Sequence, residues 1–138
     1  RHTRFRNVTG VQTCALPIFN DKVFLEWADF AGARYGTPRA PVLAALEAGK
    51  DVLLEIEIEG ARQVKKAMPE AMMVFLHPPS MSELEARITN RGTDSPERIA
   101  ARLALARAEM AAAHEFDHIV TNHRVDEVID ALVSLASS

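Results

Sequence analysis

A strand, a helix and a second strand in one short stretch constrain the fold more than any other feature of the chain. Residues 51–58 (DVLLEIEI) have an apolar first half and an alternating second half, which is typical of a strand that leaves a buried sheet. A short helix from Gly60 to Met68 and an apolar strand from Met72 to Leu76 follow. Because this order is that of a parallel crossover, we expect an α/β fold built on a parallel sheet.

The residues before this crossover indicate a strand, a turn and a helix. The apolar pattern between Lys22 and Phe30 predicts a short strand that ends in a turn at Gly32. Thr37 is expected to be the N-cap of the next helix and Pro38 its first residue, and Gly49 is expected to end it.

Capping signals predict two helices after the crossover. Ser80 with Glu83 forms a capping box for a helix that runs to Asn90, and Ser95 begins an alanine-rich helix that runs to about His114. Two helices joined by a short polar turn can move as a flap. The chain is then expected to continue with a strand over residues 117–121 and an amphipathic helix over residues 125–135.

The first 18 residues differ from the rest of the chain, because they have neither helical nor strand periodicity. Residues 8–18 (VTGVQTCALPI) resemble a translated sequencing-library adapter, and residues 1–4 resemble its preceding arm. We therefore interpret residues 1–18 as non-native and leave them out of fold reasoning, with the natural start of the protein expected elsewhere. The only cysteine, Cys14, lies in this segment, so we predict no disulfide, which suits a cytoplasmic protein.

Charge and hydropathy exclude several classes of partner. Three of the 16 basic side chains lie in residues 1–18, so the remainder has 13 basic against 19 acidic side chains and a net charge of −6. Such an acidic chain is not expected to bind nucleic acid. No apolar run approaches the roughly 18 residues of a membrane span, and the histidines have no metal-ligand spacing, so we assign no metal ligand directly. No pattern indicates an oligomeric state.

Three arginines are the sharpest candidates for chemistry in the second half. A spacing of four places Arg87 and Arg91 on one helical face, and Arg102 follows in the next helix, so the hairpin can bring three guanidiniums to one anion. Forked guanidiniums are suited to phosphate oxygens. In the alternative, Arg87 pairs with Glu83 and the arginines cover a solvated face.

Carboxylates and hydroxyls in the first half form the other candidate set. Glu55 and Glu57 stand at the end of the predicted strand, where ligands bind in open α/β sheets, although they can equally mark the strand leaving the core. Glu26, Tyr35 and Thr37 are each weak signals, and Thr37 has a sufficient role as a helix cap. Together the five side chains supply the groups that hold a polar small molecule.

The combination of segments resembles the guanylate kinase family. The segments that carry the resemblance are FLEWADFAGARYGT, LLEIEIEGARQV, VFLHPPS, ELEARITNRGTDSPERIAARL and IVTN. The resemblance covers residues 24–135 and implies a three-layer P-loop nucleoside monophosphate kinase fold with a GMP-binding region and a helical lid. It also implies transfer of the γ-phosphoryl group of ATP to GMP, which forms GDP, with Mg²⁺ bound to ATP.

The family pattern implies roles for matching residues. Glu26 and Glu55 correspond to acids that recognise guanine, and Tyr35 and Thr37 to hydroxyls that hold the phosphate and base of GMP. Glu57 stands where many members have an aspartate near the Mg²⁺ and the phosphates. The residues expected to bind ATP are the lid arginines Arg87, Arg91 and Arg102, which also stabilise charge in the reaction, and Asn122 beside the adenine.

One family motif is missing from the sequence. No G-x-x-x-x-G-K-[ST] occurs, so we expect a fold without the P-loop strand and helix, and no ATP-dependent GDP formation by this chain alone. The expected divisions are the remainder of the GMP-binding region (19–49), core (50–79), lid (80–114) and C-terminal core (115–138). Alternatives are a non-catalytic guanylate-kinase-like module that binds phosphopeptides and a P-loop kinase for another nucleotide.

Overall fold

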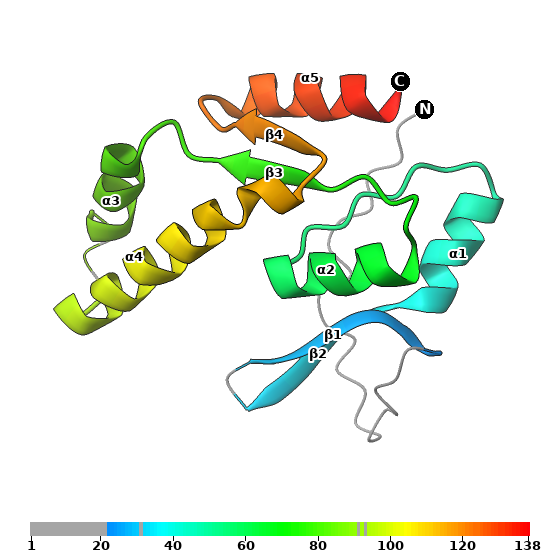
Figure 1. The fold of residues 1–138 in the computed structure, drawn as a ribbon, viewed down its shortest axis with the longest axis horizontal. Helices are drawn as coiled ribbons and strands as arrows, with labels where there is room; N and C mark the ends of the chain where they lie inside the picture. The colour runs from blue at the N-terminus through cyan, green and yellow to red at the C-terminus, as the bar shows by residue number, and fades with distance from the viewer. Residues whose placement is uncertain (1–21, 31, 91, 93) are drawn as a thin grey trace. The chain divides into compact units, whose positions relative to one another are not determined.

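The computed structural model describes residues 22–30, 32–90, 92 and 94–138 (Figure 1). The segment predicted to be non-native lies outside the described residues. The chain divides into two compact units, Arg1–Ala71 and Met72–Ser138, and the described residues of each form one two-stranded sheet. The α/β class is confirmed, but the strands form one antiparallel and one parallel pair in place of the expected single parallel sheet.

An antiparallel hairpin and two helices make up the described part of the first unit. Strand β1 (Phe24–Phe30) pairs with β2 (Ala33–Pro38), and helices α1 (Arg39–Glu47) and α2 (Ile58–Ala67) follow (Figure 1). The predicted first strand and its turn at Gly32 are confirmed, and that glycine has φ +80°. The second strand was not predicted, because tyrosine, glycine, threonine and proline in sequence indicate a turn more strongly than a strand.

The prediction that Thr37 caps the first helix is wrong. Thr37 lies within β2, and the N-cap of α1 is Pro38, which has no side-chain hydrogen bond to the helix. The strand pairing draws Thr37 away from the helix, since Thr37 stands opposite Glu26 in the register. Its hydroxyl donates a hydrogen bond to that carboxylate instead.

The predicted strand over residues 51–58 is also wrong. The described structure has no strand between Asp51 and Glu57, and α2 begins at Ile58. Leu53, which was expected to be buried, is 68% exposed. A strand requires a neighbour for its backbone N–H and C=O groups, and the described residues place no strand alongside this segment. Its exposure still alternates along the chain, as the sequence pattern does.

A parallel strand pair organises the second unit. Strand β3 (Val74–His77) pairs parallel with β4 (His118–Thr121), so both predicted strands are confirmed, while the parallel partner of β3 is β4 and not the expected segment 51–58. Helices α3 (Met81–Thr89) and α4 (Pro96–Ala111) and a short 3-10 helix, η1 (Ala113–Glu115), connect the two strands (Figure 1). Helix α5 (Val125–Ala136) completes the unit.

Both predicted helix starts in the crossover are confirmed. Ser80 Oγ accepts a hydrogen bond from the backbone N–H of Glu83 at 3.1 Å, and Ser95 Oγ accepts one from Arg98 at 3.3 Å. Helix α3 ends at Thr89, one residue earlier than expected. Each cap satisfies an N–H that has no partner within its helix.

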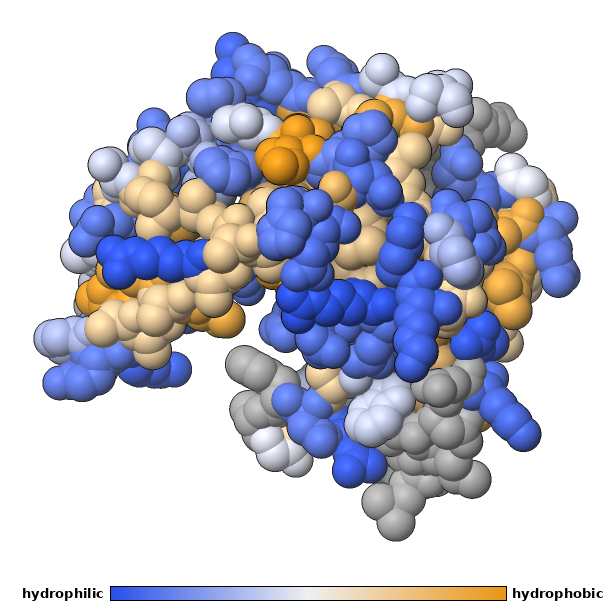
Figure 2. Space-filling view, in the orientation of Figure 1, coloured by the Kyte–Doolittle hydropathy of each residue, from blue (hydrophilic) through white to orange (hydrophobic). Residues whose placement is uncertain are grey.

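Each unit has a small apolar core of its own. Leu25 and Val64 are buried in the first unit, and an edge-to-face pair of Phe75 with Phe116, 5.3 Å between ring centroids, lies in the second. Apolar side chains remain at the surface over β4 and α5 (Figure 2), including Ile119 and Val125. Among the described residues no helix has the length and apolar character to cross a membrane.

Candidate functional site

The best-defined group of candidate residues lies on one face of the β1–β2 hairpin. The register places Glu26 opposite Thr37 and Ala28 opposite Tyr35. Because side chains alternate along a strand, these residues share a face of the hairpin. The structure therefore brings together Glu26, Tyr35 and Thr37, which lie up to eleven positions apart in the sequence.

The carboxylate of Glu26 is the central polar group of this face. Glu26 is only 8% exposed, and its Oε1 accepts a hydrogen bond of 2.6 Å from the hydroxyl of Thr37. A bond of this length to a charged acceptor is stronger than one between neutral groups. It leaves Oε2 and the remaining lone pairs for other donors, so Glu26 is oriented but not fully occupied.

Two glycines allow the close packing around this carboxylate. A Cβ at Gly36 would lie 2.6 Å from the backbone O of Glu26 and 2.9 Å from Cβ of Trp27. A Cβ at Gly60, in the first turn of α2, would lie 2.9 Å from Oε2 of Glu26. The strand β2 and the start of α2 therefore approach Glu26 more closely than a residue with a side chain allows.

Helix α2 also holds the backbone of β1. The backbone N–H of Trp27 donates to Oε1 of Gln63 at 3.0 Å, and Nε2 of Gln63 donates to the backbone O of Trp27 at 3.1 Å. Sequence reasoning missed Gln63. The two residues are 36 positions apart, and no local pattern marks a glutamine that pairs with a distant strand.

The other predicted residues of the first unit are more exposed. Tyr35 is 46% exposed on the Glu26 face. Glu55 and Glu57 are exposed in the extended segment before α2, and Glu57 is the N-cap of that helix without a side-chain hydrogen bond. Among the described residues, the carboxylates of Glu55 and Glu57 make no ion pair or hydrogen bond, so the structure does not join them to the Glu26 carboxylate.

Two of the three predicted lid arginines are paired with carboxylates of their own hairpin. Arg87 lies 3.8 Å from Glu83, one turn earlier in α3, which is the alternative that the spacing left open. Arg102 lies 3.0 Å from Asp94. Arg91 lies outside the described residues, so the expected grouping of three guanidiniums is not observed here.

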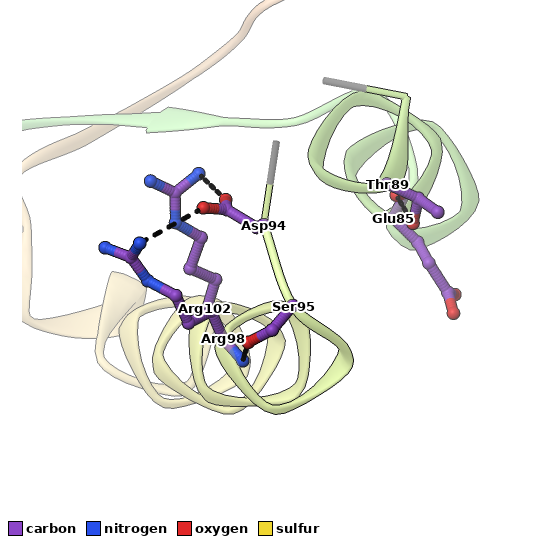
Figure 3. Close-up of polar contacts among 6 residues, drawn as sticks. All are labelled: Glu85, Thr89, Asp94, Ser95, Arg98 and Arg102. Atoms are coloured by element: carbon purple, nitrogen blue, oxygen red, sulfur yellow. Dashed lines mark hydrogen bonds and ion pairs between the residues drawn. The ribbon is translucent and has the colours of Figure 1, made fainter. Parts of the chain in front are cut away.

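The carboxylate of Asp94 is the anion that the α4 arginines contact, where a phosphate was expected. Its side chain is 9% exposed, and both Arg102 and Arg98 of α4 point toward it, at 3.0 Å and 3.7 Å (Figure 3). Sequence reasoning missed Asp94, although an acid four residues before Arg98 at a helix start is a recognisable signal.

Asn122 follows directly after β4. Its backbone N–H donates to the backbone O of His77 at 2.8 Å, so Asn122 lies beside the last residue of β3. The carboxyl ends of parallel strands are where ligands bind in open α/β sheets. The structure thus places Asn122 at a position suited to a ligand.

Groups of metal-ligating side chains are the remaining candidates for a site. The described side chains contain no group of three or more His, Cys, Asp or Glu residues that could hold a metal ion. In nucleotide sites Mg²⁺ is usually bound by one or two carboxylates together with phosphate oxygens and water. The described residues therefore do not form a metal site by themselves.

Comparison with known proteins gives a consistent result. The family model described as "Guanylate kinase" matches residues 16–138. Guanylate kinase from Thermobifida fusca is 58% identical over 114 residues, which are 83% of this chain and 58% of that protein. A guanylate kinase from Thermus thermophilus is 51% identical over 115 residues, which are 83% of this chain and 52% of that protein.

A solved structure agrees with these sequence matches. The crystal structure of guanylate kinase from Anaplasma phagocytophilum superposes with a TM-score of 0.68 at 27% identity, covering 85% of this chain and 56% of that one. The chain spans between about half and two thirds of the length of the curated relatives that it matches.

Proposed function

The chain belongs to the guanylate kinase family, and from this premise we propose that it provides guanine recognition and lid residues for transfer of the γ-phosphoryl group of ATP to GMP. The three-layer P-loop kinase fold and its phosphate-binding loop are proposed for the whole protein. The function belongs to purine nucleotide metabolism in the cytoplasm. The observation that carries the proposal is the buried, oriented carboxylate of Glu26.

Recognition of guanine follows from the chemistry of that carboxylate. Guanine presents its N1–H and 2-amino donors side by side, and a carboxylate can accept both in parallel hydrogen bonds. Adenine has an acceptor at N1, which a carboxylate repels. Because Thr37 orients one oxygen and Gly60 admits the other, Glu26 is held ready for a base that presents two donors.

The remaining residues of the first unit are assigned to the rest of GMP. The hydroxyls of Tyr35 and Thr37 lie on the Glu26 face and hold the base and phosphate. Glu55 adds a second acceptor for the base. Glu57, at the start of α2, acts near the phosphates. The exposure of Tyr35, Glu55 and Glu57 leaves each able to reach a bound nucleotide.

The lid residues are assigned to ATP. Arg87, Arg91 and Arg102 neutralise phosphate charge as the phosphoryl group moves, and Asn122 contacts the adenine. An exposed ion pair such as Arg87 with Glu83 is worth about 0–1 kcal/mol, so exchange of a carboxylate for a phosphate costs Arg87 little. Mg²⁺ enters with ATP, and when bound it neutralises charge on the phosphates.

A nucleotide titration tests the proposal on the chain itself. Trp27 is the only tryptophan and neighbours Glu26, so its fluorescence reports binding on the hairpin. We expect GMP to bind more tightly than AMP. We expect Glu26→Gln to lower GMP affinity by about 10- to 100-fold, because a hydrogen bond to a charged group contributes roughly 1.5–3 kcal/mol.

Asp29→Asn is the matched control. Asp29 lies on the opposite face of β1, where it pairs with Arg34 at 2.8 Å, so its variant should bind GMP as the unaltered chain does. Equal affinity for GMP and AMP, or unchanged GMP affinity in Glu26→Gln, would contradict the proposal.

A further inference from the structure

The carboxamide of Gln63 occupies the edge of β1 that faces away from β2. Its oxygen accepts from the N–H of Trp27 and its nitrogen donates to the carbonyl of the same residue. This exchange of two bonds is the pattern by which a residue pairs with an antiparallel neighbour strand. One side chain of α2 thus replaces a strand at this single position of the hairpin.

The pairing fixes the residue next to Glu26. Trp27 is tied on one edge by Gln63 and lies opposite Gly36 on the other, so its backbone is held from two sides. Because Glu26 shares a peptide unit with Trp27, the direction of its Cα–Cβ bond depends on this restraint.

Helix α2 makes a second approach to the same carboxylate. Gly60 lies three residues before Gln63, hence on the same face of the helix, and its position leaves no room for a Cβ beside Oε2 of Glu26. One helical face therefore sets both the backbone beside Glu26 and the position of its carboxylate. Figure 1 shows α2 lying alongside β1.

We propose that Gln63 is a positioning residue for base selectivity, which acts through Trp27 to aim the Glu26 carboxylate at the paired donors of guanine. The inference rests on the proposed GMP function. Two parallel hydrogen bonds require both oxygens to be aligned with both donors, and a displacement of a fraction of an ångström weakens one of them. Loss of Gln63 therefore affects discrimination between bases, and not only stability.

Inosine monophosphate is the probe of this alignment, because its base keeps N1–H and lacks the 2-amino group of guanine. The ratio of GMP to inosine monophosphate affinity measures the hydrogen bonds of the 2-amino group, of which the bond to Glu26 is the one that the Gln63 variants are expected to change. In the unaltered chain we expect a ratio of about 10 or more, as for a hydrogen bond to a charged group.

Two variants of Gln63 remove its bonds in steps. Gln63→Met keeps the length of the side chain and removes both hydrogen bonds, whereas Gln63→Glu keeps an acceptor for the N–H of Trp27 and loses the donor. We expect the ratio to fall to about 3 or less in Gln63→Met, with Gln63→Glu between that value and the unaltered chain.

Lys65→Met is the control for loss of a hydrogen bond from the same helix. Lys65 Nζ donates to the backbone O of Ala71 at 2.6 Å, away from β1, so this variant should keep the ratio. If GMP affinity falls in the Gln63 variants while the ratio stays unchanged, Gln63 only stabilises the fold and the inference is overturned.

The two proposals fail in distinguishable ways. Absence of GMP binding in the unaltered chain overturns the proposed function, and with it this inference. If the unaltered chain binds GMP and Gln63→Glu does not change the ratio of GMP to inosine monophosphate affinity, only the inference about Gln63 is overturned. Should Gln63→Met not fold, the ratio for Gln63→Glu decides, because that variant keeps one of the two bonds.

Discussion

The two units hold their candidate residues in opposite ways. In the first unit, Glu26 is buried, accepts a short hydrogen bond from Thr37 and packs against Gly60. In the second unit, Arg87 and Arg102 are about half exposed and pair with carboxylates of the α3–α4 hairpin. Under the proposed function, the group assigned to base recognition is fixed in place, whereas the groups assigned to phosphate are held by partners that a phosphate can replace.

The chemistry of the two proposed ligands accounts for this difference. Base selection depends on the angle and spacing of two hydrogen bonds, so it requires an acceptor that does not move. Phosphate carries its charge on several equivalent oxygens, so a flexible guanidinium can find it from many directions. Substitutions in the first unit should therefore cost more than substitutions in the second.

Gly36→Ala should have the largest effect. The added Cβ would meet the backbone O of Glu26 at 2.6 Å, and backbone cannot move aside as a side-chain end can. We expect a loss of about 2–3 kcal/mol in the free energy of unfolding of the first unit, as in other overpacked sites. Urea unfolding followed by Trp27 fluorescence measures it.

Gly60→Ala provides the matched comparison for that experiment. Its Cβ would meet side-chain atoms of Glu26, at 2.9 Å from Oε2 and 3.3 Å from Cδ, and these can shift more easily than backbone. This variant should unfold at higher urea than Gly36→Ala and yet bind GMP more weakly than the unaltered chain. If both variants are equally stable, the hairpin is not packed as tightly as described.

Asp94→Asn should have a moderate effect in the second unit. The change removes the negative charge that Arg98 and Arg102 approach. Because both arginines are exposed, water already weakens these ion pairs, so the loss of stability is moderate. We expect about 1 kcal/mol less stability at the start of α4, measured as faster amide exchange over residues 97–102. Asp126→Asn, whose pair with Arg124 is exposed on both sides, is the control and should change little.

Arg87→Ala should have the smallest effect. Its 3.8 Å pair with Glu83 joins two exposed side chains, so the melting temperature should change by an amount that corresponds to less than about 0.5 kcal/mol. Calorimetry of the variant measures it. A loss of stability as large as that in Gly36→Ala would show that Arg87 is structural and would contradict the difference between the two units.

Local signals predicted the parts of the fold that depend on near neighbours. The caps at Ser80 and Ser95 and the turn at Gly32 are confirmed, because each depends on residues within a few positions. The segment 51–57 was misassigned, because a strand forms only where another strand lies beside it. A pattern along the chain cannot report whether that neighbour is present.

The sequence predicted which residues belong to the candidate site, but not the hydrogen bonds that join them. Glu26 and Thr37 were both singled out, but the hydrogen bond between them depends on the hairpin register, and Thr37 was expected to cap a helix. Gln63 was missed because its partner is 36 residues away. Residues that act by holding a distant backbone leave no periodic or spacing signal in the sequence.

The most direct test of the account is a map of amide hydrogen exchange along the full chain with and without GMP. We expect GMP to slow exchange in β1, β2 and the first turn of α2, and to leave α3 and α4 unchanged. Protection concentrated on α3 and α4, or none anywhere at GMP concentrations that saturate the Trp27 signal, would contradict the claim that the Glu26 face is the preformed base site.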